Sequence, residues 1–275
     1  MRFNLMILAA DSESAAKAQS AGVDRIFYDL EYINKAERQR NRDTVKSLNN
    51  IDSIPAVRKV VTTSQLLVRT NPIHAYSQVE IDKAVGYGAD ILMLPMVIDQ
   101  HDVECYVDMV AGRAKVCIMI ETAQALTRID KILSVPGIDE VFIGLNDLHI
   151  SLGLAFMFEP LSGGLVEYLA DKCRAHGIPF GFGGIARIGE GILPSDYILG
   201  EHVRLQSQSV ILSRTFKGEV GQPGSGNFVL KDEIQKVREC LDRISLWSEA
   251  DHLLNRKLIA GAVDAIVSRV SQKNS

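Results

Sequence analysis

Short apolar segments recur along this chain of 275 residues, and a helical stretch follows most of them. Several are nearly continuous in aliphatic and β-branched residues, which is typical of parallel strands covered by helices on both faces. The eight predicted strands are Leu5–Ala9, Arg25–Leu30, Leu66–Thr70, Ile91–Pro95, Lys115–Ile120, Glu140–Gly144, Pro179–Gly183 and His202–Ile211. Eight strands alternating with helices predict a closed (β/α)₈ TIM barrel over residues 1–217.

The stretches between these segments carry helix signals, because most of them end just before a glycine. The predicted helices are Ser12–Ser20, Ser77–Tyr87, Gln100–Val110, Thr122–Ser134 and Val166–Ala175. An open, doubly wound sheet is the alternative fold. It requires a Gly-rich turn after the first strand, and residues 9–12 contain no glycine.

A Gly/Pro-rich segment, residues 218–229, is predicted to link the barrel to a helical extension over residues 230–275. Leu230–Trp247 and Glu249–Ser271 are the predicted helices of this extension. They contain more apolar positions than a solvent-facing tail requires. Two interpretations remain open: the helices pack on the outer wall of their own barrel, or they exchange with a partner subunit.

Charge and cysteine content narrow the class of protein. The net charge of −4 gives no electrostatic footprint for nucleic acid or an anionic membrane. The four cysteines are scattered and form no C-x-x-C pair, which indicates reduced thiols in a cytoplasmic protein. The apolar run at the N-terminus is too short for a secretory signal or a membrane span. We therefore expect a cytoplasmic protein with a small-molecule substrate.

Barrel enzymes carry their catalytic groups at the C-terminal ends of the strands. Polar residues at the ends of four predicted strands are Asp29, Glu31, Arg69, Glu121, Asn146 and Asp147. Glu121 and Asp147 are one βα unit apart, so their side chains can converge. Two carboxylates without histidine or cysteine predict a Mg²⁺ or Mn²⁺ site.

Arg69 suits the same site, because its planar fork can bind a substrate carboxylate through two hydrogen bonds. A 2-oxo acid could then chelate the ion, which would act as a Lewis acid. Structural alternatives exist for each residue. Asp147 could be a helix N-cap, and Arg69 could simply pair with a neighbouring acid.

At these residues the chain resembles the HpcH/HpaI aldolase and citrate-lyase β-subunit family, over about residues 3–215. The matching segments are GVDRIFYDLE (22–31), LVRTNP (67–72), GADILMLPMV (88–97), IMIET (118–122) and VPGIDEVFIGLNDLHISLG (135–153). The resemblance implies a phosphate-free, Mg²⁺- or Mn²⁺-assisted C–C lyase or aldolase, and a homo-oligomer (trimer or hexamer) with exchanged C-terminal helices.

The same resemblance implies that Glu121 and Asp147 bind the metal and that Arg69 contacts the substrate. Residues in the matching segments that we also expect to contact substrate are Pro95, Gly144 and Asn146.

Two departures concern proton transfer. The pyruvate-aldolase branch has a histidine where this chain has Tyr32, and the partner aspartate of that histidine falls near Gly86. The acyl-CoA lyase branch reads DLED, and Tyr32 replaces its second aspartate. Lys35 and Arg38 lie downstream and would bind CoA if the substrate carried it.

The remaining candidates for moving a proton are Tyr32, His74, His149 and metal-bound water, and Glu31 belongs to the same catalytic group. His74 is the best placed of the histidines by strand order. The leading hypothesis is a lyase or aldolase acting on a 2-oxo acid. The alternatives are a citrate-lyase-like enzyme for acyl-CoA or carboxylic acids, and a non-catalytic barrel that binds metal and 2-oxo acid.

Overall fold

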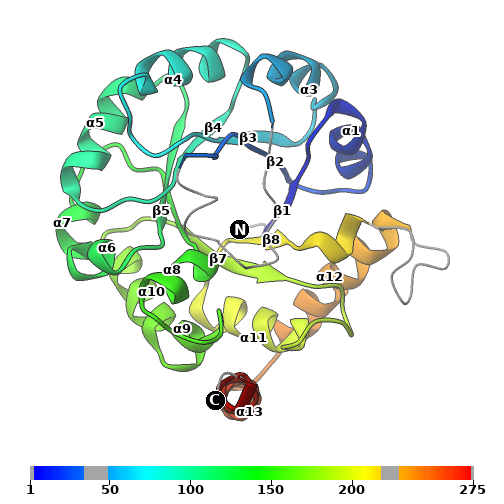
Figure 1. The fold of residues 1–275 in the computed structure, drawn as a ribbon. Coiled ribbons are helices and arrows are strands. Elements are labelled where there is room, and N and C mark those ends of the chain that lie inside the picture. Colours follow the sequence, from blue (N-terminus) through cyan, green and yellow to red (C-terminus); the bar gives the residue numbers. More distant parts are fainter. Residues whose placement is uncertain (1–2, 34–48, 218–228, 274–275) are drawn as a thin grey trace.

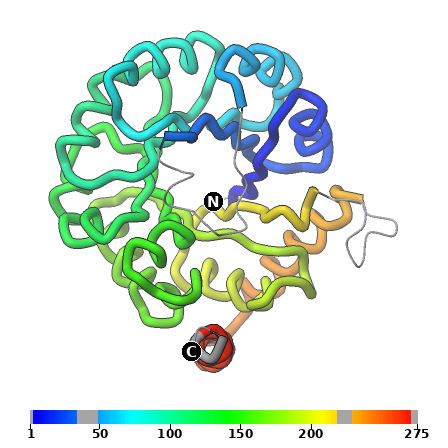
Figure 2. Tube along the Cα trace, viewed as in Figure 1, coloured from blue at the N-terminus to red at the C-terminus, as the bar shows by residue number. Residues whose placement is uncertain are grey.

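A closed barrel of eight parallel strands, paired in sequence order, forms the centre of the computed structural model, which describes residues 3–33, 49–217 and 229–273 (Figure 1). The strands are β1 (Asn4–Leu8), β2 (Arg25–Asp29), β3 (Gln65–Arg69), β4 (Ile91–Leu94), β5 (Lys115–Ile120), β6 (Glu140–Ile143), β7 (Phe180–Ile185) and β8 (Ser209–Leu212). The chain runs once around the ring (Figure 2). The predicted TIM barrel is confirmed.

Helices cover the outside of the strands. Those of the barrel are α1 (Ser12–Ser20), α3 (Ile54–Val60), α4 (Ser77–Gly86), α5 (Gln100–Val110), α6 (Ala123–Thr127), α7 (Ile129–Leu133), α8 (Leu145–Ser151), α9 (Glu159–Ser162), α10 (Leu165–Ala175) and α11 (Ser195–Leu205), with 3₁₀ turns η1 (Ile51–Ser53) and η2 (Arg214–Lys217). Capping boxes begin α1 at Asp11 and α5 at Asp99. No helix in these described ranges is both long and apolar enough to span a membrane.

Two of the predicted elements differ from the structure by more than their end residues. The eighth strand was predicted from His202, but residues 202–205 end α11 and the strand begins at Ser209. The single helix predicted over Thr122–Ser134 is two short helices, α6 and α7, which meet at Arg128. Both errors arise because a short apolar run does not by itself distinguish a strand from a helix, or one helix from two.

The interior of the barrel has polar ends and an apolar middle. At the lower end, where the strands begin, Arg25 forms a buried ion pair with Glu140 across the barrel at 2.7 Å. The middle is filled by side chains from six strands: Met6, Phe27, Leu67, Ile91, Met93, Cys117, Met119 and Phe142. Because side chains alternate along a strand, the next inward positions after Phe27 and Leu67 are Asp29 and Arg69. The C-terminal end of the barrel is therefore polar.

Two helices follow the barrel, α12 (Leu230–Ile244) and α13 (Glu249–Lys273). In α12 the buried residues are Ile234, Val237, Cys240 and Ile244, and Arg238 donates to the main-chain oxygen of Phe3 and pairs with Asp24. The helix therefore lies against the lower ends of β1 and β2.

The second of these helices, α13, lies outside α11 (Figure 1) and is fixed there by Asn255, which donates to the main-chain oxygen of Tyr197 at 3.0 Å. In the single chain, both C-terminal helices lie against the barrel. The predicted linker falls outside the described residues except for Val229.

Candidate active site

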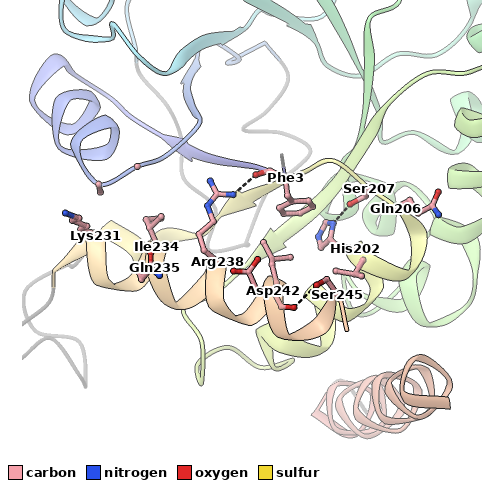
Figure 3. A pocket seen from close by; sticks show the side chains of 14 residues that line it. Phe3, His202, Gln206, Ser207, Lys231, Ile234, Gln235, Arg238, Asp242 and Ser245 are labelled. Carbon is pink, nitrogen blue, oxygen red and sulfur yellow. Dashed lines mark hydrogen bonds between the residues drawn. The ribbon is translucent and has the colours of Figure 1, made fainter. Parts of the chain in front are cut away.

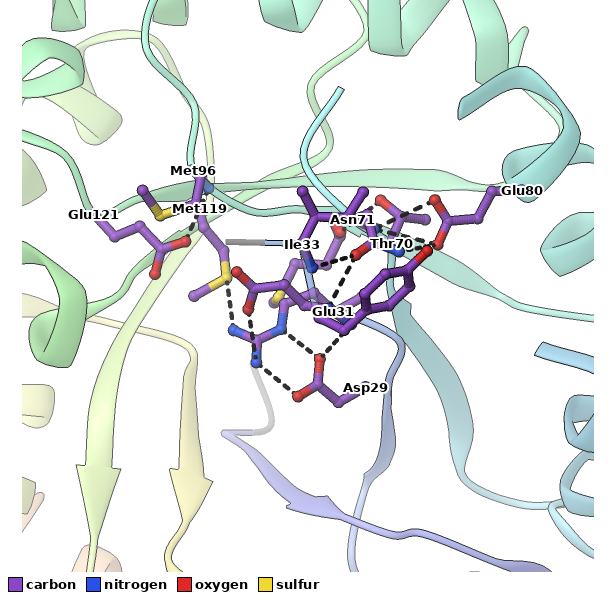
Figure 4. A network of polar contacts seen from close by, with 12 residues as sticks. Asp29, Glu31, Ile33, Thr70, Asn71, Glu80, Met96, Met119 and Glu121 are labelled. Carbon is purple, nitrogen blue, oxygen red and sulfur yellow. Dashed lines mark hydrogen bonds and ion pairs between the residues drawn. The ribbon is translucent and has the colours of Figure 1, made fainter. Parts of the chain in front are cut away.

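Arg69 ends β3, and two carboxylates from the end of β2 fix its guanidinium. Its Nε and Nη2 each donate to one oxygen of Asp29 at 2.8 Å, and Nη2 lies 3.2 Å from Oε2 of Glu31 (Figure 4). Burial alone lowers the pKa of Arg69, but the charges of Asp29 and Glu31 outweigh it and hold the pKa above its ordinary value. Arg69 is therefore a fixed cation.

The third nitrogen of the guanidinium, Nη1, lies 3.6 Å from the sulfur of Met119. A thioether is a weak acceptor, so an oxygen of a bound ligand would be a better partner for this nitrogen. The pairing with Asp29 therefore fixes one side of the fork and leaves Nη1 as the donor that can bind a carboxylate or keto oxygen.

Glu121 follows β5 and is almost fully buried, at 1% exposure. Its Oε1 accepts a 2.9 Å hydrogen bond from the main-chain N–H of Met96, just beyond β4. Met96 has φ +56°, in the left-handed region that few non-glycine residues adopt. On the other side, a Cβ added to Gly144 would lie 2.5 Å from Oε2 of Glu121. Glycine at 144 leaves room for this carboxylate.

The carboxylate of Glu121 lies among other acids. Burial, followed by the charges of Glu31 and Asp147, raises its pKa to about 8, while Arg69 and the N–H of Met96 act in the opposite direction. Asp147 is also buried, in the first turn of α8. A divalent cation beside Glu121 and Asp147 would offset this excess negative charge, so the donor set fits Mg²⁺ or Mn²⁺.

Neither Glu121 nor Asp147 occupies the N-cap position of a helix. Thr122 caps α6, since its side chain accepts from the N–H of Ala125, and the N-cap position of α8 is Gly144. Within the described ranges, no three or more His, Cys, Asp or Glu side chains are placed to hold one metal. Magnesium commonly uses only one or two protein carboxylates and takes its other ligands from water and substrate.

His74 belongs to a neighbouring group of contacts. The N–H of Tyr76 donates to its Nδ1 at 3.2 Å, which leaves the ring proton on Nε2, and Nε2 lies 3.1 Å from Oε2 of Glu80. Both ring nitrogens therefore have protein partners. Tyr32 is 66% exposed, and its main-chain N–H donates to Asn71.

The other predicted site residues lie as follows. Pro95 is buried beside Met96, and Asn146 is half-buried in the first turn of α8. His149 is buried, with Nδ1 3.2 Å from the main-chain oxygen of Leu145. Lys35 and Arg38 are outside the described residues.

Two cavities lie at opposite ends of the barrel. A cavity of about 480 Å³ at the upper end, between the loops after β2 and β3 and helix α4, is lined by Leu30, Tyr32, Asn49, Asn50, Ile51, Asn71, His74, Tyr76, Val79, Glu80 and Lys83. A larger one of about 730 Å³ lies between α12 and the lower ends of β1 and β8, and Phe3, His202 and Arg238 are among its lining residues (Figure 3). The catalytic end of a TIM barrel is the upper one.

Sequence reasoning missed several contacts of this site. Asp29 was noted at a strand end but not as the partner of Arg69, although it alternates with Glu31 and so faces the same side. The role of Gly144 as space for Glu121, and the contacts of Met96, Asn71 and Glu80, were not predicted. The unusual φ of Met96 has no signal in the sequence, since neither glycine nor asparagine stands there.

The fixed arginine and the buried carboxylates lie at the C-terminal end of the barrel, where TIM-barrel enzymes carry their active sites. The sequence pattern of the HpcH/HpaI aldolase/citrate lyase family matches residues 2–158. This match covers more than half of the chain, and the protein belongs to that family.

One curated relative, a hydroxypyruvate/pyruvate aldolase of Rhizorhabdus wittichii, is 47% identical over 77 residues, which span 26% of this chain and 31% of the relative. The match therefore covers about a third of that protein.

Solved structures show the same fold. A HpcH/HpaI aldolase/citrate lyase family protein from Burkholderia cenocepacia is similar with a TM-score of 0.62 and 15% identity, over 88% of this chain and 95% of that one. The citrate synthase SbnG gives a TM-score of 0.60 and 19% identity, over 78% and 88%.

Proposed function

We propose that this protein is a divalent-metal-dependent carbon–carbon lyase or aldolase that acts on a 2-oxo acid. The observation that carries the proposal is the fixed cation of Arg69 next to the buried, acid-rich position of Glu121. A 2-oxo acid has a carboxylate and an adjacent keto oxygen, and such a ligand matches one arginine donor and one metal position. The aldolase relative from Rhizorhabdus supports the same reaction class.

Each side chain has a distinct part in this proposal. Nη1 of Arg69 binds a substrate oxygen, while Asp29 and Glu31 keep the guanidinium in place. Glu121 and Asp147 would hold Mg²⁺ or Mn²⁺, and the bound ion would supply Lewis-acid stabilisation of the charge that develops on the keto oxygen. Pro95, Gly144 and Asn146 would contact the substrate. For proton transfer, His74 and Tyr32 remain our predictions.

The proposal extends to assembly and location. Leucines of the C-terminal segment are exposed on the single chain: Leu246, Leu253, Leu254 and Leu258. Their exposure supports a homo-oligomer, because contiguous apolar surface usually marks an interface. All four cysteines are free, which supports a cytoplasmic location.

The direct test is pyruvate release from a 4-hydroxy-2-oxo acid, measured with Mg²⁺ or Mn²⁺ and again in excess chelator. We expect turnover with metal, none with chelator, and loss of about 10³-fold or more in Glu121→Ala. Arg69→Lys keeps the charge but loses the planar fork, so KM for the 2-oxo acid should rise. Undiminished turnover in chelator would refute the proposal.

A further inference from the structure

The segment that carries Glu31 depends on a side chain of another loop for its position. Residues 30–33 follow β2 without belonging to a strand. The main-chain N–H groups of Tyr32 and Ile33 both donate to Oδ1 of Asn71, at 3.0 and 3.1 Å. Asn71 is 4% exposed and comes two residues after Arg69, so it connects the ends of β2 and β3.

Asn71 is in turn oriented by Glu80, on helix α4. Oε1 of Glu80 accepts from Nδ2 of Asn71 at 2.9 Å, and the main-chain N–H of Asn71 lies 3.3 Å from the same oxygen. Oε2 faces Nε2 of His74 at 3.1 Å. An amide held on both sides has one orientation, with its oxygen toward Tyr32 and its nitrogen toward Glu80.

These contacts lead directly to the guanidinium. Glu31 precedes Tyr32, and its side chain, which is fully buried, lies 3.2 Å from Arg69. The N–H of Glu31 also donates to Oδ1 of Asp29 at 3.1 Å. In Figure 4, Asp29 and Glu31 lie between Glu121 with Met96 on one side and Asn71 with Glu80 on the other.

We propose that Glu80 is a positioning residue of this site: through Asn71 it fixes the main chain after β2 and so keeps Glu31 and Asp29 on Arg69. The inference rests on the proposed function, because Arg69 is there the group that binds the 2-oxo acid. The side chain of Glu80 contacts Asn71 and His74 rather than Arg69 or the predicted metal ligands. A misplacement of about 1 Å in such a support can reduce a rate by about 10²-fold.

The test compares Glu80→Ala and Asn71→Ala with Asp82→Ala. Asp82 lies on the same helix, and its ion pair is on the surface, with Arg113 at 2.7 Å. In the first two variants we expect pyruvate release to fall by about 10²-fold and hydrogen exchange of the peptide containing Tyr32 and Ile33 to rise by about tenfold. The affinity for Mn²⁺ should stay within about twofold in all three, because Glu121 and Asp147 are unchanged.

A double variant that exchanges the donor and acceptor of Asn71 and Glu80 tells a positioning role of Glu80 from a general loss of structure. Combining Asn71→Asp with Glu80→Gln exchanges donor and acceptor between the two side chains, while an oxygen still faces the N–H groups of Tyr32 and Ile33. Each single change should impair pyruvate release, and the double change should restore at least part of it. A double variant no better than the worse single variant would overturn the proposal.

Oxalate binding in the presence of Mn²⁺ keeps this inference separate from the proposed function. If the native protein turns over no 2-oxo acid, the proposed function fails, and the role of Glu80 is judged on oxalate affinity alone. We expect Glu80→Ala to weaken that affinity by about tenfold. An affinity equal to that of the native protein, or faster exchange at Tyr32 and Ile33 with unchanged pyruvate release, would overturn the role of Glu80.

Discussion

The main-chain N–H of Met96 donates a 2.9 Å hydrogen bond to Glu121, from a residue held at φ +56°. The unfavourable backbone of one residue thus orients the carboxylate of another. Such strain persists only where the surrounding structure imposes it, and it is common at binding sites. Glu121 is consequently fixed before any ligand arrives, with Gly144 leaving space on its other side.

Gly144→Ala should disrupt the site with little effect on the barrel. The added Cβ would lie 2.5 Å from the Glu121 carboxylate and 3.0 Å from Cε of Met119, so the carboxylate must move. We expect Mn²⁺ affinity and pyruvate release to fall by about tenfold or more. Gly86→Ala is the matched control, since a Cβ there meets nothing within 4 Å. Native Mn²⁺ affinity in Gly144→Ala would contradict the prediction.

Glu121→Gln should stabilise the metal-free fold and abolish its stabilisation by metal. The pKa of Glu121 is raised to about 8 by burial and by neighbouring acids, so its ionisation destabilises the metal-free fold as pH rises from 4.5 toward 8. At pH near 8 the metal-free variant should therefore unfold at higher urea concentration than the native protein.

With Mn²⁺ the difference should shrink, because the native protein gains about 2.7 kcal/mol at 100 times its Kd and the variant gains none. Urea unfolding with and without Mn²⁺ measures both effects. Glu104→Gln, at an exposed position, is the control and should behave like the native protein. A metal-free variant that is less stable than the native protein would show that the carboxylate is not destabilising.

His202 should make the fold sensitive to acid. Its ring stacks on Phe182 at 3.7 Å, and burial lowers its pKa from 6.5 to about 3. The folded state therefore binds this proton only well below the pH at which the unfolded chain does. The contribution of neutral His202 to the free energy of unfolding is fully present above pH 6.5. It is lost as pH falls toward 3, by about 2 kcal/mol between pH 6.5 and 5.

His202→Phe preserves the stacking and removes this part of the pH dependence. Urea unfolding at several pH values should show a shallower decline for His202→Phe than for the native protein. His176→Phe, at an exposed histidine, should leave the decline unchanged. Parallel curves for His202→Phe and the native protein would show that His202 does not cause the loss of stability in acid.

Leu254→Glu combined with Leu258→Glu should dissociate the proposed oligomer. These side chains are 57% and 42% exposed on the single chain, and a charge in an apolar interface is strongly unfavourable. Light scattering after size-exclusion chromatography should give a smaller mass for the variant than for the native protein. Lys257→Glu lies on the same helix and should retain the native mass. A monomeric native protein would remove the basis of the prediction.

The sequence predicted the parts of this molecule that depend on local pattern. The first seven strands, β1 to β7, were recognised because parallel strands buried on both faces are nearly continuous in apolar residues. The eighth was placed too early: Ile198, Leu199, His202 and Leu205 are buried at helical spacing, which places them on one face of α11.

The site was predictable to the extent that strand ends converge in a barrel. Arg69, Glu121 and Asp147 were predicted in this way, and the opposing charges of Arg69 and Glu121 influence one another in the structure. The contact of Asn71 with Glu80 was not predicted, because it depends on how α4 docks after a loop. A spacing of nine residues in the sequence does not by itself predict that the two side chains meet.

The position of α12 has a consequence for synthesis of the chain. The ring closes when β8 pairs with β1, so a nascent chain has two open sheet edges until most of it has left the ribosome. Unpaired edges favour association with other chains. Arg238 reaches the start of β1 and Asp24 only after closure is possible. If translation stops before α12, the released barrel lacks the contact of Arg238 with the start of β1 and Asp24. Such a barrel would be a substrate for chaperones and proteases.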